Sequence, residues 1–115
     1  MRLGTLTLIS LKVNKMQNAQ LLNFEKYSET VVFNEKTMPD ALKREHCTKT
    51  GVWGQIIVCD GTLLYLREDR PAQVVTKDHP AIIYPAERHS VQPKGRVQFR
   101  VEFFRDPNAS GGEHA

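Results

Sequence analysis

The stretch WGQIIVCDGTLLYL, residues Trp53–Leu66, contains two apolar, β-favouring runs on either side of the dipeptide Asp60-Gly61. Both central residues of a two-residue type I′ turn need a positive φ, and Asp-Gly between apolar runs is a strong short-range signal for such a turn. We therefore predict a β-hairpin in which Trp53–Cys59 pairs with Thr62–Leu66. Because Cys59 lies in the apolar run, we expect its thiol to be buried and reduced.

Short β-rich runs also occupy the rest of the chain, and turn residues separate them. They are Thr30–Phe33, Gln73–Thr76, Ala81–Tyr84 and Val97–Phe104. The last run alternates, so Val and Phe at 97, 99, 101 and 103 are predicted to face the core, whereas Arg100 and Glu102 face solvent or another subunit. Helical turns are expected only within Asn18–Ser28 and Pro39–Arg44. Many short strands at this spacing predict an all-β sandwich or barrel.

Length and composition describe one ordinary globular domain. The 115 residues, 40% of them hydrophobic, suffice for a core without metal or disulfides, and the two cysteines lack CxxC spacing. They exclude a barrel of about 250 residues or a dinucleotide fold with a second domain. The net charge of +3 is too small and too dispersed to indicate a nucleic-acid partner. No apolar run of about 18 residues predicts a transmembrane helix, and we expect a cytoplasmic protein.

The two ends of the chain differ from its middle. Thr and Leu alternate in Met1–Val13, which predicts an extra β-strand rather than a signal peptide, and Met16 is an alternative start. Asp106–Ala115 is rich in small and polar residues, which is typical of a flexible tail. We expect an N-terminal extension over residues 1–29, a barrel over 30–105 and a tail over 106–115. The extra strand would pair with the sheet or with a partner subunit, so a homodimer is expected.

Two histidines are candidate metal ligands. His46 precedes the predicted hairpin, and His89 opens a strand after a proline-containing turn. Two imidazoles on adjacent strands of a small barrel can share a divalent ion such as zinc. The third ligand stays open among Glu45, Cys47 and Glu87, and the alternative is that both histidines are structural. The sequence contains no nucleophile elbow, P-loop or glycine-rich dinucleotide motif.

The run His46–Gly54 has the pattern H-x-T-K-x-G-x-W-G, with Val32–Pro39 before it and Tyr84–His89 after it. In this order and spacing the segments resemble the cupin-like domain of the tellurite-resistance protein TehB and the related stand-alone YeaR-type proteins. The resemblance covers about Thr30–Phe104. It implies an all-β, cupin-like double-stranded β-helix, or jelly roll, built from two antiparallel sheets. It also implies an association with tellurite or oxyanion stress.

The chain departs from this family and from metal-binding cupins in two respects. In the longer TehB proteins the domain precedes a methyltransferase that uses S-adenosylmethionine, whereas this chain has only a short tail after Phe104, so that activity is not carried over. The metal-cupin motif G-x5-H-x-H-x3,4-E-x6-G is absent, and P-x-G-x-x-H is only approximated between Pro85 and His89. A full site of three histidines and one glutamate is therefore not expected.

The resemblance directs attention to three candidate ligand-binding residues. Lys49 would place a cation at the barrel mouth for a small anionic ligand. Thr48 would cap a turn through its hydroxyl, and Trp53 would plug one end of the barrel. The preferred hypothesis is a small-ligand or metal-binding module linked to tellurite resistance and not an enzyme. The alternatives are an interaction or dimerisation domain that acts with a separate methyltransferase, and a metal-dependent cupin enzyme.

Overall fold

The computed structural model describes residues 21–44 and 47–107, and most of its regular elements are β-strands. The strands are β1 (Glu25–Glu29), β2 (Phe33–Asn34), β3 (Trp53–Arg67), β4 (Gln73–Val75), β5 (Ala81–Ile83) and β6 (His89–Arg105), and a 3-10 helix, η2, spans Asp40–Lys43. All the strand pairs are antiparallel. The predicted all-β class is therefore confirmed.

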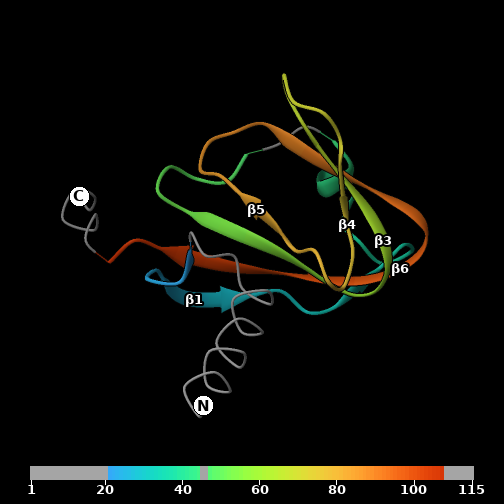
Figure 1. The fold of residues 1–115 in the computed structure, drawn as a ribbon, viewed down its shortest axis with the longest axis horizontal. Coiled ribbons are helices and arrows are strands. Elements are labelled where there is room, and N and C mark those ends of the chain that lie inside the picture. The colour runs from blue at the N-terminus through green and yellow to red at the C-terminus, as the bar shows by residue number, and fades with distance from the viewer. Residues whose placement is uncertain (1–20, 45–46, 108–115) are drawn as a thin grey trace, which may run out of the picture.

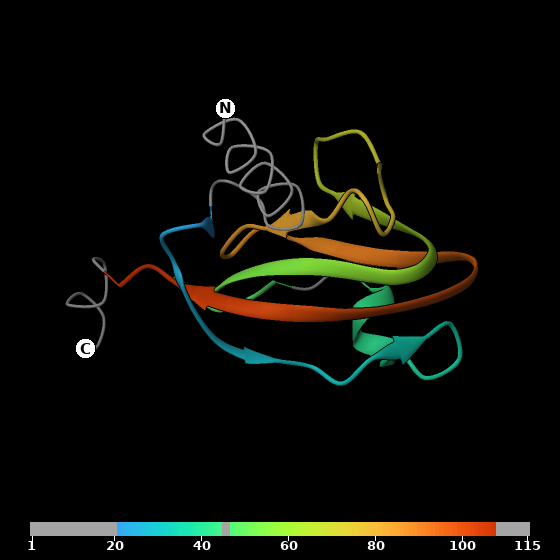
Figure 2. The ribbon, with the colours of Figure 1, turned by 60° about the horizontal axis from the view of Figure 1, so that its bottom comes forward.

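Two long strands form the frame of the fold. β3 has 15 residues and β6 has 17, and they pair from Trp53 opposite Phe104 to Arg67 opposite His89. The short strands attach to this frame: β1 and β2 pair with β6, whereas β4 and β5 pair with β3. Figures 1 and 2 show that the long pair bends as it crosses the molecule, so the sheet curls around an interior.

The hairpin predicted at Asp60-Gly61 is wrong, because β3 runs through these residues without reversing. Gly61 lies opposite Val97 of β6, and the register shifts on both sides of the Asp-Gly pair. Gly61 has the positive φ that the sequence suggests, +86°. Here that conformation forms a bulge, which bends a strand and increases its twist, instead of a turn.

The alternating pattern in β6 is confirmed, because Val97, Phe99 and Val101 are buried and belong to the main core. Strand pairing explains their depth, since Ile56 lies opposite Val101 and Val58 opposite Phe99. This core also contains the buried residues Met38, Leu63, Tyr65, Val75, Ala81, Ile83 and Val91. A second, smaller cluster packs elsewhere, with Leu21, Ile82 and Phe104 at its centre and Phe24, Trp53 and Tyr84 beside it.

Two predicted burial states are wrong. Cys59 is exposed, because it lies at the edge of the bulged region, and its Sγ is 3.9 Å from Nη1 of Arg100. Glu102, which was expected to face solvent or another subunit, is buried within the chain itself, with 8% of its surface exposed. Its carboxylate accepts hydrogen bonds from Arg100 at 2.7 Å and from Lys26 at 3.2 Å, so charge partners compensate its burial.

Some of the short elements match the sequence predictions and others do not. The runs Gln73–Thr76 and Ala81–Tyr84 form β4 and β5 to within one residue, and η2 lies inside the helical turn expected at Pro39–Arg44. The helical turn expected within Asn18–Ser28 is wrong for residues 25–28, which belong to β1, and in Thr30–Phe33 only Phe33 belongs to a strand. The strand expected in Met1–Val13, Met16 and the tail beyond 107 lie outside the described residues.

No helix in residues 21–44 and 47–107 is long and apolar enough to cross a membrane.

Candidate functional site

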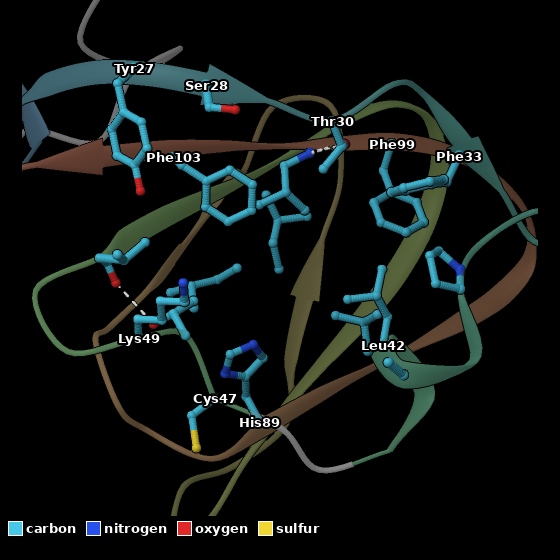
Figure 3. Close-up of a pocket in the computed structure, with 18 residues that line it drawn as sticks. Tyr27, Ser28, Thr30, Phe33, Leu42, Cys47, Lys49, His89, Phe99 and Phe103 are labelled. Atoms are coloured by element: carbon cyan, nitrogen blue, oxygen red, sulfur yellow. Dashed lines mark hydrogen bonds between the residues drawn. The ribbon is translucent and has the colours of Figure 1, made fainter.

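A cavity of about 520 Å³ lies inside the curled sheet. Its walls come from β1, β2, η2, the segment that precedes β3, and the long strands, so residues far apart in the sequence meet there (Figure 3). Most of the described lining is hydrocarbon: Phe33, Pro39, Ala41, Leu42, Val52, Ile56, Ile83, Val91, Phe99, Val101 and Phe103. The volume and the apolar character are those of a small-molecule site.

A few polar side chains interrupt the apolar wall. They are Tyr27, Ser28, Thr30, Cys47, Thr48, Lys49 and His89. In Figure 3, Tyr27, Ser28 and Thr30 lie on one side of the cavity, and Cys47, Lys49 and His89 lie on the opposite side. None of the described lining residues is an aspartate, a glutamate or an arginine. Every fixed charge on the described wall is therefore positive.

His89 is the buried polar group of the cavity, with 2% of its surface exposed. It opens β6, and its Nδ1 lies 2.9 Å from the carbonyl oxygen of Glu87. A carbonyl only accepts hydrogen bonds, so Nδ1 carries the proton and donates it. The ring also contacts the ring of Tyr65 edge-on, with 5.7 Å between the centroids. These contacts fix the orientation of the imidazole.

The candidate Lys49 begins a tight turn at the cavity wall. The backbone N–H of Val52 donates to the Lys49 carbonyl at 3.0 Å, and Gly51, the third residue of the turn, has a φ of +82°. These features fit a type II turn, which requires a positive φ at that position. Thr48 adds a second tie, since its Oγ1 donates to the Val52 carbonyl at 2.9 Å. The predicted turn-capping role of Thr48 matches this contact.

Trp53 lies away from the cavity. It packs in the second apolar cluster, with its ring centroid 5.1 Å from that of Phe24 and 5.2 Å from that of Tyr84. The structure therefore brings Thr48, Lys49 and His89 to one cavity and separates Trp53 from them. Residue periodicity explains the separation, because successive side chains of a strand point to opposite faces of the sheet.

The described residues do not assemble a metal centre. No group of three histidine, cysteine or acidic side chains in residues 21–44 and 47–107 has a metal-binding arrangement. His46 and Glu45 lie outside the described residues. Glu87, another candidate third ligand, is 3.5 Å from Nε of Arg70 and 3.9 Å from Nη1 of Arg67. Cys47 is exposed and lines the cavity.

Sequence reasoning missed a buried polar cluster behind His89. Tyr65 is fully buried, and the guanidinium of Arg67 lies 5.1 Å from its ring centroid. Burial raises the pKa of the Tyr65 hydroxyl, so this group stays protonated at neutral pH. The hydroxyl oxygen of Tyr65, Nε of Arg67 and Oε1 of Glu87 are buried without a hydrogen-bond partner. The only sequence signal for this cluster was the polar Arg67 at the end of an apolar run.

Comparison with known proteins places the fold. A protein of Escherichia coli strain K12 superimposes with a TM-score of 0.68 at 21% identity, over 75% of this chain and 94% of that one. TehB from Haemophilus influenzae gives a TM-score of 0.67 at 18% identity, over 77% of this chain but only 36% of TehB. A cupin-like protein of Thermotoga maritima gives 0.49 at 18% identity, over 81% of this chain and 65% of that one.

The sequence comparison agrees with the fold. No curated protein matches the chain. The family model of the TehB-like domain matches residues 28–101, which is more than half of the 115 residues. The matched segment includes the described cavity lining except Tyr27 and Phe103. The chain has an all-β fold and belongs to the TehB-like domain family.

Proposed function

We propose that this chain is a small-ligand-binding module that acts in resistance to tellurite or related oxyanions and is not itself an enzyme. The observation that carries the proposal is the cavity of about 520 Å³ with its hydrocarbon wall. Small-molecule sites typically have about 300–1,000 Å³ and combine an apolar lining with a few polar groups. The link to tellurite rests on membership of the TehB-like family.

The wall of the cavity favours an organic ligand over a bare inorganic oxyanion. Phe33, Phe99 and Phe103 present rings to the space, and an oxyanion in contact with these rings would lose hydration that hydrocarbon cannot replace. An organic molecule buries its apolar body against these rings and leaves its polar group to His89 or Lys49. The module would then contribute to oxyanion resistance by binding an organic compound.

A zinc site is not part of this proposal. No group of three or more histidine, cysteine, aspartate or glutamate side chains in residues 21–44 and 47–107 could hold a metal ion. A catalytic centre is also left out of the proposal, because most of the described lining is hydrocarbon.

The binding proposal is tested with a neutral fluorescent probe, N-phenyl-1-naphthylamine, whose emission rises in apolar surroundings. The variant Val101→Phe fills the cavity, since Val101 lines it and is buried. We expect at least tenfold weaker probe binding. Val91→Phe, a second filling variant, is expected to behave alike. The matched control is Val74→Phe, because Val74 is 55% exposed on β4 and does not line the cavity.

Circular dichroism and thermal unfolding verify that each variant is folded. Unchanged probe binding in both folded filling variants would refute the cavity as the binding site. The association with tellurite is tested separately, by the growth of bacteria that express the wild-type chain or Val101→Phe in potassium tellurite. We expect increased tolerance only with the wild type. Equal tolerance would remove the association and leave ligand binding intact.

A further inference from the structure

The described cavity wall carries one permanent charge, which is positive, and this restricts the charge of the ligand. Lys49 is the one described lining residue with a permanent charge. Its ammonium group makes no ion pair with any residue in the described ranges. An unpaired cation beside an apolar cavity is suited to a ligand that carries one negative charge.

We propose that the ligand is an aromatic monocarboxylate whose ring enters the cavity and whose carboxylate lies at Lys49. This inference rests on the proposed small-molecule function of the cavity and specifies its chemical class. A cationic ligand would be repelled by Lys49, and a dianion would bring a second charge for which the described wall holds no permanent partner.

The position of Lys49 is built into the backbone. The turn from Lys49 to Val52 is closed by its own hydrogen bond, and the Thr48 hydroxyl ties the same Val52 residue through its carbonyl. Gly51 supplies the positive φ that the turn needs. Because the loop is held before any ligand arrives, less conformational entropy is lost on binding. The side chain itself is exposed, so it can reach an anionic group at the opening.

The opposite wall favours an aromatic body. The rings of Phe33 and Phe99 are 5.7 Å apart between centroids and inclined by 57°, and Phe103 and Tyr27 contribute further rings to the lining. Aromatic rings prefer such tilted or edge-on neighbours, which add to the favourable burial of their surface. In Figure 3 these rings lie across the cavity from Lys49. A single ligand can therefore pack its ring between them and place its carboxylate at Lys49.

The contribution of the carboxylate should be moderate. Exposed ion pairs contribute little to affinity, and partial exclusion of water by the apolar wall strengthens them. We therefore expect the carboxylate to bind about three- to tenfold more tightly than a neutral analogue at low salt. The advantage should shrink in about 0.5 M salt, where the Debye length is a few ångströms.

The test uses three probes that share one naphthalene ring and differ only in the head group: naphthylacetate, naphthylethanol and naphthylethylammonium. Their affinities are measured near neutral pH by displacement of N-phenyl-1-naphthylamine from the full chain. We expect the order carboxylate, alcohol, ammonium. In Lys49→Gln, naphthylacetate should lose its advantage while naphthylethanol binds as before. The matched control is Lys77→Gln, because Lys77 is exposed and lies away from the cavity.

A second pair of variants tests whether the turn positions the lysine. Thr48→Val removes the hydroxyl that ties Val52, whereas Thr50→Val makes the same change at an exposed residue of the turn. We expect the preference for carboxylate over alcohol to fall only in Thr48→Val.

The outcomes separate this inference from the proposed function. Equal affinities of naphthylacetate and naphthylethanol, unchanged in Lys49→Gln, would overturn the monocarboxylate and leave the ligand-binding cavity standing. Tighter binding of the ammonium probe would also overturn it. If N-phenyl-1-naphthylamine itself does not bind to the chain, the proposed small-molecule function fails.

Discussion

Replacement of Gly61 by alanine tests the close approach of β3 to its neighbour β6 at the bulge. A Cβ atom at Gly61 would lie 2.0 Å from the carbonyl oxygen of Arg96 and 2.9 Å from Cα of Val97. Both atoms belong to the backbone of β6, so a side-chain rotation cannot relieve the contact. The φ of +86° adds a conformational strain for any residue with a Cβ. We expect Gly61→Ala to be among the most destabilising single substitutions in the chain.

The expected magnitude follows from two contributions. The left-handed φ costs an alanine about 1–2 kcal/mol. To move from 2.0 Å to an ordinary contact of about 3.4 Å, the two strands must separate by roughly 1.4 Å, which disrupts about two ladder hydrogen bonds at about 0.5–1.5 kcal/mol each. Together these contributions predict a loss of about 3 kcal/mol in the free energy of unfolding. For a domain of this size the loss corresponds to roughly 10 °C in Tm.

The matched control is Gly95→Ala. Gly95 also has a positive φ, +73°, but its Cβ would meet no atom within 4 Å, so only the conformational strain applies. Urea unfolding should give a loss of about 1 kcal/mol for Gly95→Ala, with an unchanged m value. The two variants also share the same change in unfolded-state entropy, which cancels in the comparison. Equal losses would refute the close strand crossing and favour the hairpin that Asp60-Gly61 first suggested.

Two further substitutions test local backbone and charge. Ala86→Gly should stabilise the fold by about 0.5 kcal/mol in urea unfolding, because Ala86 has a φ of +60° that glycine adopts without strain; a net loss would contradict this. The Glu35 carboxylate accepts a hydrogen bond from the Val97 N–H at 3.0 Å, and this bond lowers the pKa of Glu35 in the folded state. The bond therefore stabilises the fold fully above the unfolded pKa of about 4.3, and this stabilisation is lost as the pH falls through the lower folded pKa. Glu35→Gln should therefore weaken the dependence of Tm on pH below about pH 5, and an identical acid profile would disprove the contribution.

The strands were predictable wherever side-chain alternation and burial coincide. Val97–Phe104 alternates along one core-facing strand, and the short runs that form β4 and β5 are bounded by turn residues. Asp60-Gly61 was misinterpreted because its local signal, a positive φ, fits both a turn and a bulge. Only the presence of β6 alongside β3 decides between them, and this contact joins residues more than thirty positions apart.

Parts of the site were predictable for a different reason. Lys49 and Thr48 lie in one short motif with Gly51, and the hydrogen bonds that close their turn join residues at most four positions apart in the sequence. Trp53 follows the same motif but begins β3, so the pleat of the strand directs it to the other cluster. The aromatic wall could not be located from the sequence, because Tyr27, Phe33 and Phe99 come from three strands whose pairing no local pattern specifies.

The bulge at Gly61 and the cavity have a common physical origin. Paired strands as long as β3 and β6 twist even when their register is regular, and a bulge adds the local bend that lets such a pair curl over an interior. The two register shifts around Asp60-Gly61 bend the paired strands β3 and β6. The short strands that pair with them, β1 and β2 on β6 and β4 and β5 on β3, then surround an interior. Phe99 lies opposite Val58, just before the first shift, and lines the cavity. The residue pair that misled the hairpin prediction therefore helps to give the domain the curvature on which a binding site depends.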